Sequence, residues 1–190
     1  IAKAFNEIRY AAIEQHLDIS RAKVQLLPHY LCHHYHAYYS GSVRGEDVVI
    51  VHNEAIGDGY NAVVSMPTAN GLSMICGNAE TDLGRLYKWI TLLLGMKPHQ
   101  HEYKLMGLAP YSNSYEQAKA AKVFDPLFKV DHDEMLIKYN ERPGDLYFHF
   151  RDQLKSCRFD GIAAALQSMV ERLLAEWIEV VLAKTGKKSV

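Results

Sequence analysis

The sequence predicts an α/β fold in which a mixed sheet is flanked by helices. Two observations carry this prediction. The uninterrupted β-branched run Val48–Val51 is typical of a central strand that is covered on both faces. Residues 162–181 repeat apolar side chains at helical spacing and predict one long helix with a continuous buried stripe. Segments with strand and helix patterns alternate around these two, and strands interleaved with helices indicate an α/β domain.

The first forty residues predict a helix, a strand and a second helix. Residues 2–17 place apolar side chains at helical spacing. Val24–Leu27 is a short apolar run that ends at Pro28, and we expect a buried strand there. The next helix is expected over His29–Tyr39, with Gly41 as a left-handed C-cap.

The middle of the chain predicts a hairpin followed by a helix. Tyr60–Met66 and Leu72–Cys76 flank a turn-forming Pro-Thr-Ala-Asn-Gly stretch and therefore read as paired strands. A helix is expected to begin at Thr81 or Asp82 and to stop at Gly95.

The last part of the chain mixes short elements with the long helix. A short helix is expected over Glu102–Leu108, and short helices with a strand at Leu127–Val130 are expected between residues 114 and 156. Val190 has the character of the first residue of a further strand.

Composition excludes several classes of protein. With 48% hydrophobic and 23% charged residues, the chain is an ordinary globular one. Its 21 basic and 22 acidic residues nearly cancel, which removes the electrostatic footprint of a nucleic-acid-binding protein. No run of 18 apolar residues exists, so a membrane-spanning helix is not expected. Three widely spaced cysteines imply no disulfide framework and favour a reducing, cytoplasmic compartment.

A histidine cluster opens the second predicted helix. His29 and His33 are four residues apart, so they lie on one helix face and can offer two imidazoles to one cation. On spacing alone the plainer interpretation, that they are surface or capping residues, is the more common one.

Four segments, in order, resemble the O-carbamoyltransferases of antibiotic and nodulation-factor biosynthesis. Residues 29–41 resemble the HHxxHxxSAFYxS segment of that family, and residues 83–95 resemble its LGxxYxxxTxxLG segment. Residues 102–111, EYKLMGLAPY, look like its E(G/Y)KxMGLAxYG segment and are the most specific match. Residues 162–171 are similar to its IAxxxQxxxE helix.

This resemblance implies a fold and a reaction. Residues 1–190 would be a fragment of the N-terminal domain, which has the actin-like ATPase (ribonuclease H-like) fold. The fragment would lack the first strands and the C-terminal nucleotide-binding part, and would be inactive alone. A second domain of the same chain makes carbamoyl-adenylate from carbamoyl phosphate and ATP. The N-terminal domain transfers the carbamoyl group to a hydroxyl of a small-molecule acceptor, and no nucleic-acid or membrane partner is implied.

The resemblance also implies a metal centre. In the family, the counterparts of His29 and His33 bind a divalent metal, commonly iron, with zinc as a possibility. An aspartate normally follows the strand, but Asn53 stands at that place, and an amide is a poorer ligand that cannot act as a base. Either Asp58 or Glu54 takes over, or the metal binds weakly.

The loop after the strand supplies further candidates. Asn53, Gly57 and Gly59 are expected to contact the bound cofactor, and Asp58 between the two glycines is a candidate for catalysis. A glycine-flanked aspartate is more often a simple turn residue.

The EYKLMGLAPY segment supplies the remaining catalytic candidates. Glu102 is a candidate general base for the acceptor hydroxyl, with Asp58 as the alternative, and Lys104 is a candidate for neutralising a phosphate or an oxyanion. The plainer interpretation of Glu102 and Lys104 is a solvated charge pair. Gly107 is expected where two backbones approach closely.

Two other functions stay open, together with the identity of the acceptor. The chain is alternatively an actin-like metal-binding domain with different chemistry, such as hydrolysis, or a degenerate relative without catalysis. The stretch from Ser112 to Lys155 matches no motif and is the expected region of acceptor selection.

Overall fold

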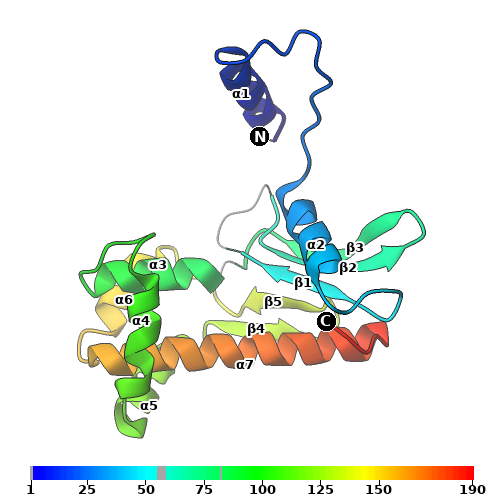
Figure 1. Cartoon of the computed structure of the whole chain (residues 1–190). Helices are drawn as coiled ribbons and strands as arrows, with labels where there is room; N and C mark the ends of the chain where they lie inside the picture. Colours follow the sequence, from blue (N-terminus) through cyan, green and yellow to red (C-terminus); the bar gives the residue numbers. More distant parts are fainter. Residues whose placement is uncertain (1, 55–58, 82) are drawn as a thin grey trace.

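The computed structural model describes residues 2–54, 59–81 and 83–190 (Figure 1). The predicted site residues Gly57 and Asp58 and the alternative cap Asp82 lie outside these ranges. The fold is a mixed α/β arrangement of helices and small antiparallel sheets, as the alternating patterns predicted.

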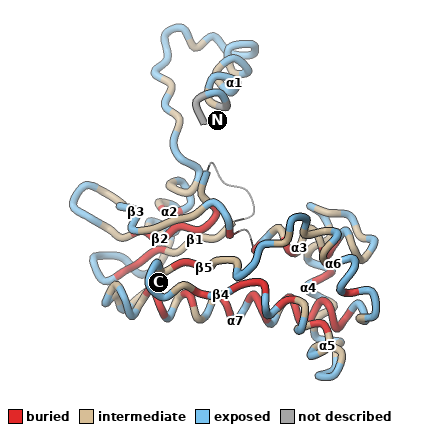
Figure 2. Tube along the Cα trace, turned by 180° about the vertical axis from the view of Figure 1, so that it is seen from behind, coloured by how far each residue is buried: buried red, intermediate tan, exposed pale blue. Residues whose placement is uncertain are grey.

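The N-terminal helix α1 (Ala2–Glu14) stands apart from the rest of the structure (Figures 1 and 2). The connection that follows is mainly extended, and the Tyr10 hydroxyl of α1 donates to the carbonyl of Val24 at 3.1 Å. The predicted strand at Val24–Leu27 is wrong, since no strand is formed there and Leu27 is 55% exposed. An apolar run becomes a strand only where a neighbouring backbone pairs with it.

Three strands form the first sheet, in the order β1-β2-β3. They are β1 (Ile50–Asn53), β2 (Ala62–Thr68) and β3 (Gly71–Asn78), and both pairings are antiparallel. The predicted hairpin is confirmed, with strands that extend further into the turn than expected. Only Ala69 and Asn70 separate the two strands, so Pro67 and Thr68 lie in β2 itself.

The C-terminal residues of the chain lie beside the start of β1. Val48 forms a parallel bridge with Ser189, and the backbone N–H of Val49 donates to the carbonyl of Ser189 at 2.9 Å. Ser189 therefore already pairs with the sheet, and the strand character of Val190 itself stays a prediction.

Helix α2 (His29–Ser40) lies against this sheet and contacts β1 and β3 (Figure 1). The helix is confirmed, but its predicted left-handed C-cap is wrong because Gly41 has an extended backbone with φ −67°. A Cβ at this position would lie 2.8 Å from the carbonyl oxygen of Ala37. The absent side chain serves close approach there.

Four further helices gather around one half of the long helix α7 (Phe159–Thr185) (Figure 1). They are α3 (Leu83–Leu93), α4 (Glu102–Leu108), α5 (Ser114–Phe124) and α6 (Leu146–Gln153), with the 3-10 turn η1 (Ala109–Tyr111) after α4. Gly95 follows α3 in the left-handed region, as predicted, at φ 74°. Thr81 does not cap α3 with its hydroxyl, which donates to the carbonyl of Ile137.

A second, two-stranded sheet rests on α7. It consists of β4 (Phe128–Asp131), which confirms the strand predicted one residue earlier, and β5 (Leu136–Tyr139), which was not predicted. The indole N–H of Trp177 donates to the carbonyl of Met135 at 2.7 Å and joins α7 to the start of β5.

The core follows the predicted stripe of α7. Leu166, Leu173, Trp177 and Val181 are almost fully buried, and Figure 2 shows buried segments along the length of this helix. Among the described helices, none has the length and apolar character needed to cross a membrane.

Candidate metal centre

Helix α2 presents two groups of histidines to the sheet. His34 is the one buried residue of α2, at 1% exposure, and its ring meets those of Tyr30 and His52 edge to face. His29 and His33 are four residues apart and therefore share a helix face. His34 is the residue after His33, so it lies on the neighbouring face of the helix. This places their imidazoles at the rim of the helix–sheet contact, beside the end of β1.

Three side chains converge at this rim. The Nε2 atoms of His29 and His33 are 3.0 Å apart, and an Oε2 atom of Glu54 lies 2.9 Å from Nε2 of His29. The ligand atoms of all three residues lie within 4.8 Å of one another, and no other such group of three occurs among the residues the structure describes. The predicted proximity of His29 and His33 is therefore present, and Glu54 joins them.

The spacing and the chemistry of these atoms fit a divalent ion. Two ligands that each lie about 2.1 Å from one ion, at right angles to each other, are about 3.0 Å apart. Two imidazoles and one carboxylate are the ligand set of non-haem iron(II) sites and of many catalytic zinc sites. The same atoms also lie at hydrogen-bond distance from one another.

His52 lies directly behind the three candidate ligands. Its ring stacks on that of His33, with centroids 4.9 Å apart and planes at 26°. Its Nε2 lies 3.2 Å from Oε1 of Glu54, the carboxylate oxygen that does not face His29. His52 was not predicted, although the two-residue period of a strand places residues 52 and 54 on one side and 53 on the other.

His34 adds no positive charge to this cluster at neutral pH. Burial, together with the neighbouring His52 and His33, lowers the pKa of His34 from 6.5 to about 4. Neither ring nitrogen has a hydrogen-bond partner within the described part of the chain. The ring therefore stays neutral and acts as a packing residue against Tyr30 and His52.

Asn53 makes a contact away from the histidines. Its side-chain amide donates to the carbonyl of Thr81 at 3.0 Å, which joins the end of β1 to the start of α3. The backbone N–H of Glu54 donates to the carbonyl of Asn61 at 2.8 Å and fixes the residue after the strand. Gly59 has φ 103°, which suits a glycine, and no contact of it bears on the predicted cofactor role.

The family model for the carbamoyltransferase N-terminus matches residues 3–190. The chain belongs to this family. None of the curated proteins compared with it gives a match. The family resemblance drawn from the motifs is confirmed, and carbamoyl transfer is the reaction that the family description names.

Glu102 and Lys104 of this carbamoyltransferase domain lie elsewhere. Both are on α4, which contacts α3 and α7 and is separated from α2 in Figure 1. An Oε1 atom of Glu102 accepts from the backbone N–H of His99 at 2.6 Å, and Lys104 is exposed beside the ring of Tyr103. The structure does not bring this pair to His29 and His33.

Two of the family motifs meet in a hydrogen-bonded chain. The Tyr87 hydroxyl of α3 donates to Oε1 of Gln167 at 2.7 Å, and the Gln167 amide donates to Glu171 at 2.7 Å. Burial, with the nearby carboxylate of Glu171, raises the pKa of Tyr87 to about 12. These motif residues of the carbamoyltransferase domain therefore join α3 to α7.

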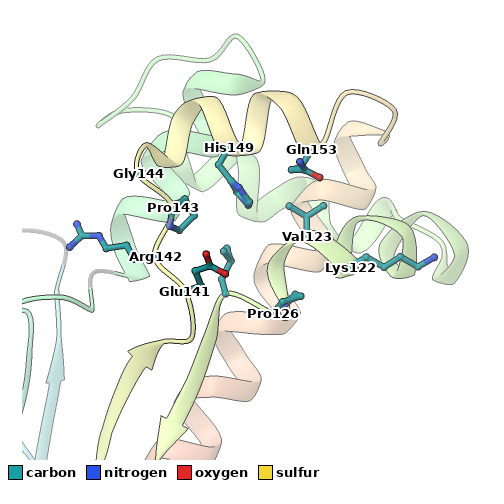
Figure 3. Close-up of a pocket in the computed structure, with 10 residues that line it drawn as sticks. Lys122, Val123, Pro126, Glu141, Arg142, Pro143, Gly144, His149 and Gln153 are labelled. Atoms are coloured by element: carbon teal, nitrogen blue, oxygen red, sulfur yellow. The ribbon is translucent and has the colours of Figure 1, made fainter.

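A hollow of about 470 Å³ lies between α5, α6 and the turn after β5 (Figure 3). Figure 3 shows His149 and Gln153 directed into it, whereas Lys122 and Arg142 point away. Its lining residues all fall within the stretch expected to select the acceptor. The hollow lies at the helical end of the domain, away from α2 in Figure 1, so it does not adjoin the histidine cluster.

Proposed function

We propose that this domain transfers a carbamoyl group to a hydroxyl of a small-molecule acceptor, with a divalent ion held by His29, His33 and Glu54. The observation that carries the proposal is the convergence of these three side chains in a member of the carbamoyltransferase family. Iron is the proposed ion, with zinc as the alternative, because the ligand set serves both.

The proposed fold is one part of an actin-like, ribonuclease H-like domain. Support comes from the strand order β3-β2-β1, with the segment at Ser189 parallel to the start of β1 and following α7. In this reading Val190 opens the next strand of a mixed sheet.

The reaction makes three demands on the protein. It needs an activated donor, a deprotonated acceptor and stabilisation of the charge that develops on the carbamoyl oxygen. We propose that the donor is carbamoyl-adenylate, made from carbamoyl phosphate and ATP by another domain of the same chain. The ion, when bound, acts as a Lewis acid toward the carbamoyl oxygen. His29, His33 and Glu54 hold it at the rim of the α2–sheet contact, where His29 is accessible at 45% exposure.

We assign deprotonation of the acceptor to Asp58 rather than to Glu102. Asp58 follows Glu54 by four residues in the sequence, whereas Glu102 belongs to α4 at the other end of the domain. Glu102 already accepts a backbone hydrogen bond, which suits a residue that shapes its own turn. Lys104 lies on the same helix and is exposed, so it is not assigned a role at this centre either.

The proposed location is the cytoplasm. Support comes from the three cysteines, which are free, with Cys32 exposed. Thiols persist in a reducing compartment. The proposed partners are the acceptor and the adenylate-forming domain.

The test separates the two half-reactions in the full-length protein. In His33→Ala we expect metal content and carbamoyl transfer to fall, with formation of carbamoyl-adenylate unchanged. The matched control is His36→Ala, since His36 is on the same helix but contacts Ser40 and not the cluster. An equal loss of adenylate formation, or unchanged metal content and transfer in His33→Ala, would contradict the proposal.

A second candidate function is a metal-binding domain that does not transfer carbamoyl groups. Asn53 favours it, because an amide that donates to a carbonyl offers neither negative charge nor a base. In that case the wild-type protein binds metal but forms no carbamoylated product from supplied carbamoyl-adenylate. Hydrolysis of an activated ester by the metal-loaded protein would identify the hydrolytic form of this alternative.

A further inference from the structure

We propose that His52 is a positioning residue of the metal centre, which orients the carboxylate of Glu54 and the ring of His33 toward the ion. The inference rests on the metal centre described under the proposed function. It concerns a residue outside the set of three candidate ligands.

The contacts of Glu54 divide its two carboxylate oxygens between two histidines. Oε2 lies 2.9 Å from Nε2 of His29, inside the ligand group, and Oε1 lies 3.2 Å from Nε2 of His52. The side chains of His52 and Glu54 are only 12% and 13% exposed. One oxygen therefore faces the proposed ion, and the other faces a shielded imidazole.

Nε2 of His52 and Oε1 of Glu54 face each other, and both lack a hydrogen-bond partner among the described residues. Both are buried, and neither makes a hydrogen bond of good geometry with another described residue. A buried polar atom without a partner is costly, and a small rotation of the carboxylate aligns the two atoms. An ion at Oε2 that fixes this rotation would satisfy both.

The second contact of His52 acts on the other ligand. Its ring stacks on His33 at 4.9 Å and also meets the ring of His34 edge to face. His52 thereby restricts the ring of one ligand and the carboxylate of another. Groups that hold metal ligands in this way change affinity by about 10–100-fold when they are removed.

The experiment measures Co²⁺ affinity of the full-length protein by titration and the number of bound imidazoles by X-ray absorption. His52→Phe keeps a ring against His33 and removes the nitrogen atom that faces Oε1 of Glu54. His52→Gln keeps an N–H donor and removes the ring. We expect the dissociation constant to rise about 10–100-fold in His52→Phe and by a smaller factor in His52→Gln. We also expect two bound imidazoles in the wild-type protein.

Each result bears on the inference. Three bound imidazoles in the wild-type protein that fall to two in His52→Phe would make His52 a ligand and overturn the positioning role. An affinity of His52→Phe within twofold of the wild type would also overturn it. If the wild-type protein binds no Co²⁺, Zn²⁺ or Fe²⁺, the metal centre itself fails. Binding that is lost in His33→Ala but unchanged in both His52 variants would leave the centre standing and reject this inference alone.

Discussion

Metal binding should slow the opening of helix α2, because this helix is weakly anchored without it. α2 has twelve residues, and its one buried side chain is His34, a polar group without hydrogen-bond partners in the described structure. Two of the three proposed ligands belong to α2, and the third, Glu54, follows β1. An ion held by all three therefore joins the helix to the sheet.

The size of the effect follows from binding linkage. If opening of α2 releases the ion, the free-energy cost of opening rises by RT ln(1 + [L]/Kd), which is about 2.7 kcal/mol at a free-ion concentration of about 100 Kd. Backbone amides of α2 that exchange through this opening should then exchange about 100-fold more slowly. Amides in the centre of α7, which is packed in the core, should not respond.

The assay is hydrogen–deuterium exchange of the α2 peptides with and without metal. His33→Ala should abolish the response, and His36→Ala should keep it. Equilibrium dialysis under the same conditions shows whether metal is bound. Bound metal with unchanged exchange in α2 would refute the reasoning, since it would mean that the helix does not supply the ligands.

Three further predictions concern helix packing, one buried hydrogen bond and the role of Glu102. Gly161→Ala should cost about 1–3 kcal/mol of unfolding free energy, because its Cβ would lie 2.7 Å from a backbone oxygen of α5. In the control Gly107→Ala the added Cβ meets nothing within 4 Å, so this variant should be neutral or stabilising. Equal chemical-denaturation midpoints of the two variants would contradict this. Tyr87→Phe should lower the free energy of unfolding by about 1 kcal/mol, because the hydrogen bond to Gln167 is lost. The pKa of Tyr87 is about 12 in the folded state, above its ordinary value of 10.0, so wild-type stability from this hydroxyl should be complete below pH 10 and be lost toward pH 12, a decline that the Phe variant lacks. Glu102→Gln should retain metal and lower transfer by less than tenfold, since the amide oxygen can still accept from the turn; a fall of about 10²–10⁴ would restore Glu102 as the general base.

The sequence predicted those parts of the fold whose signal is local. The long helix, the hairpin and α2 carry strong periodicity or turn residues, and they form as expected. The strand predicted at Val24–Leu27 is wrong, because an apolar run does not indicate whether a neighbouring strand is available to pair with it. Gly107 was expected at a close backbone approach that the structure does not contain there, whereas Gly161, which the sequence did not single out, makes one. Close approach depends on which helices pack together, and the local sequence pattern does not determine this.

In the candidate site, too, the local spacing could be predicted, whereas the residue that completes the group could not. The helical spacing of His29 and His33 was enough to predict their shared face, and the structure brings their Nε2 atoms to 3.0 Å. The third group was sought at Asn53 or Asp58, with Glu54 as an alternative. Asn53 follows His52 directly, and successive strand residues point to opposite sides, so the face toward α2 belongs to residues 52 and 54. The longer side chain of Glu54 then reaches His29 from just beyond the strand. An asparagine at position 53 therefore does not by itself remove the carboxylate from this centre.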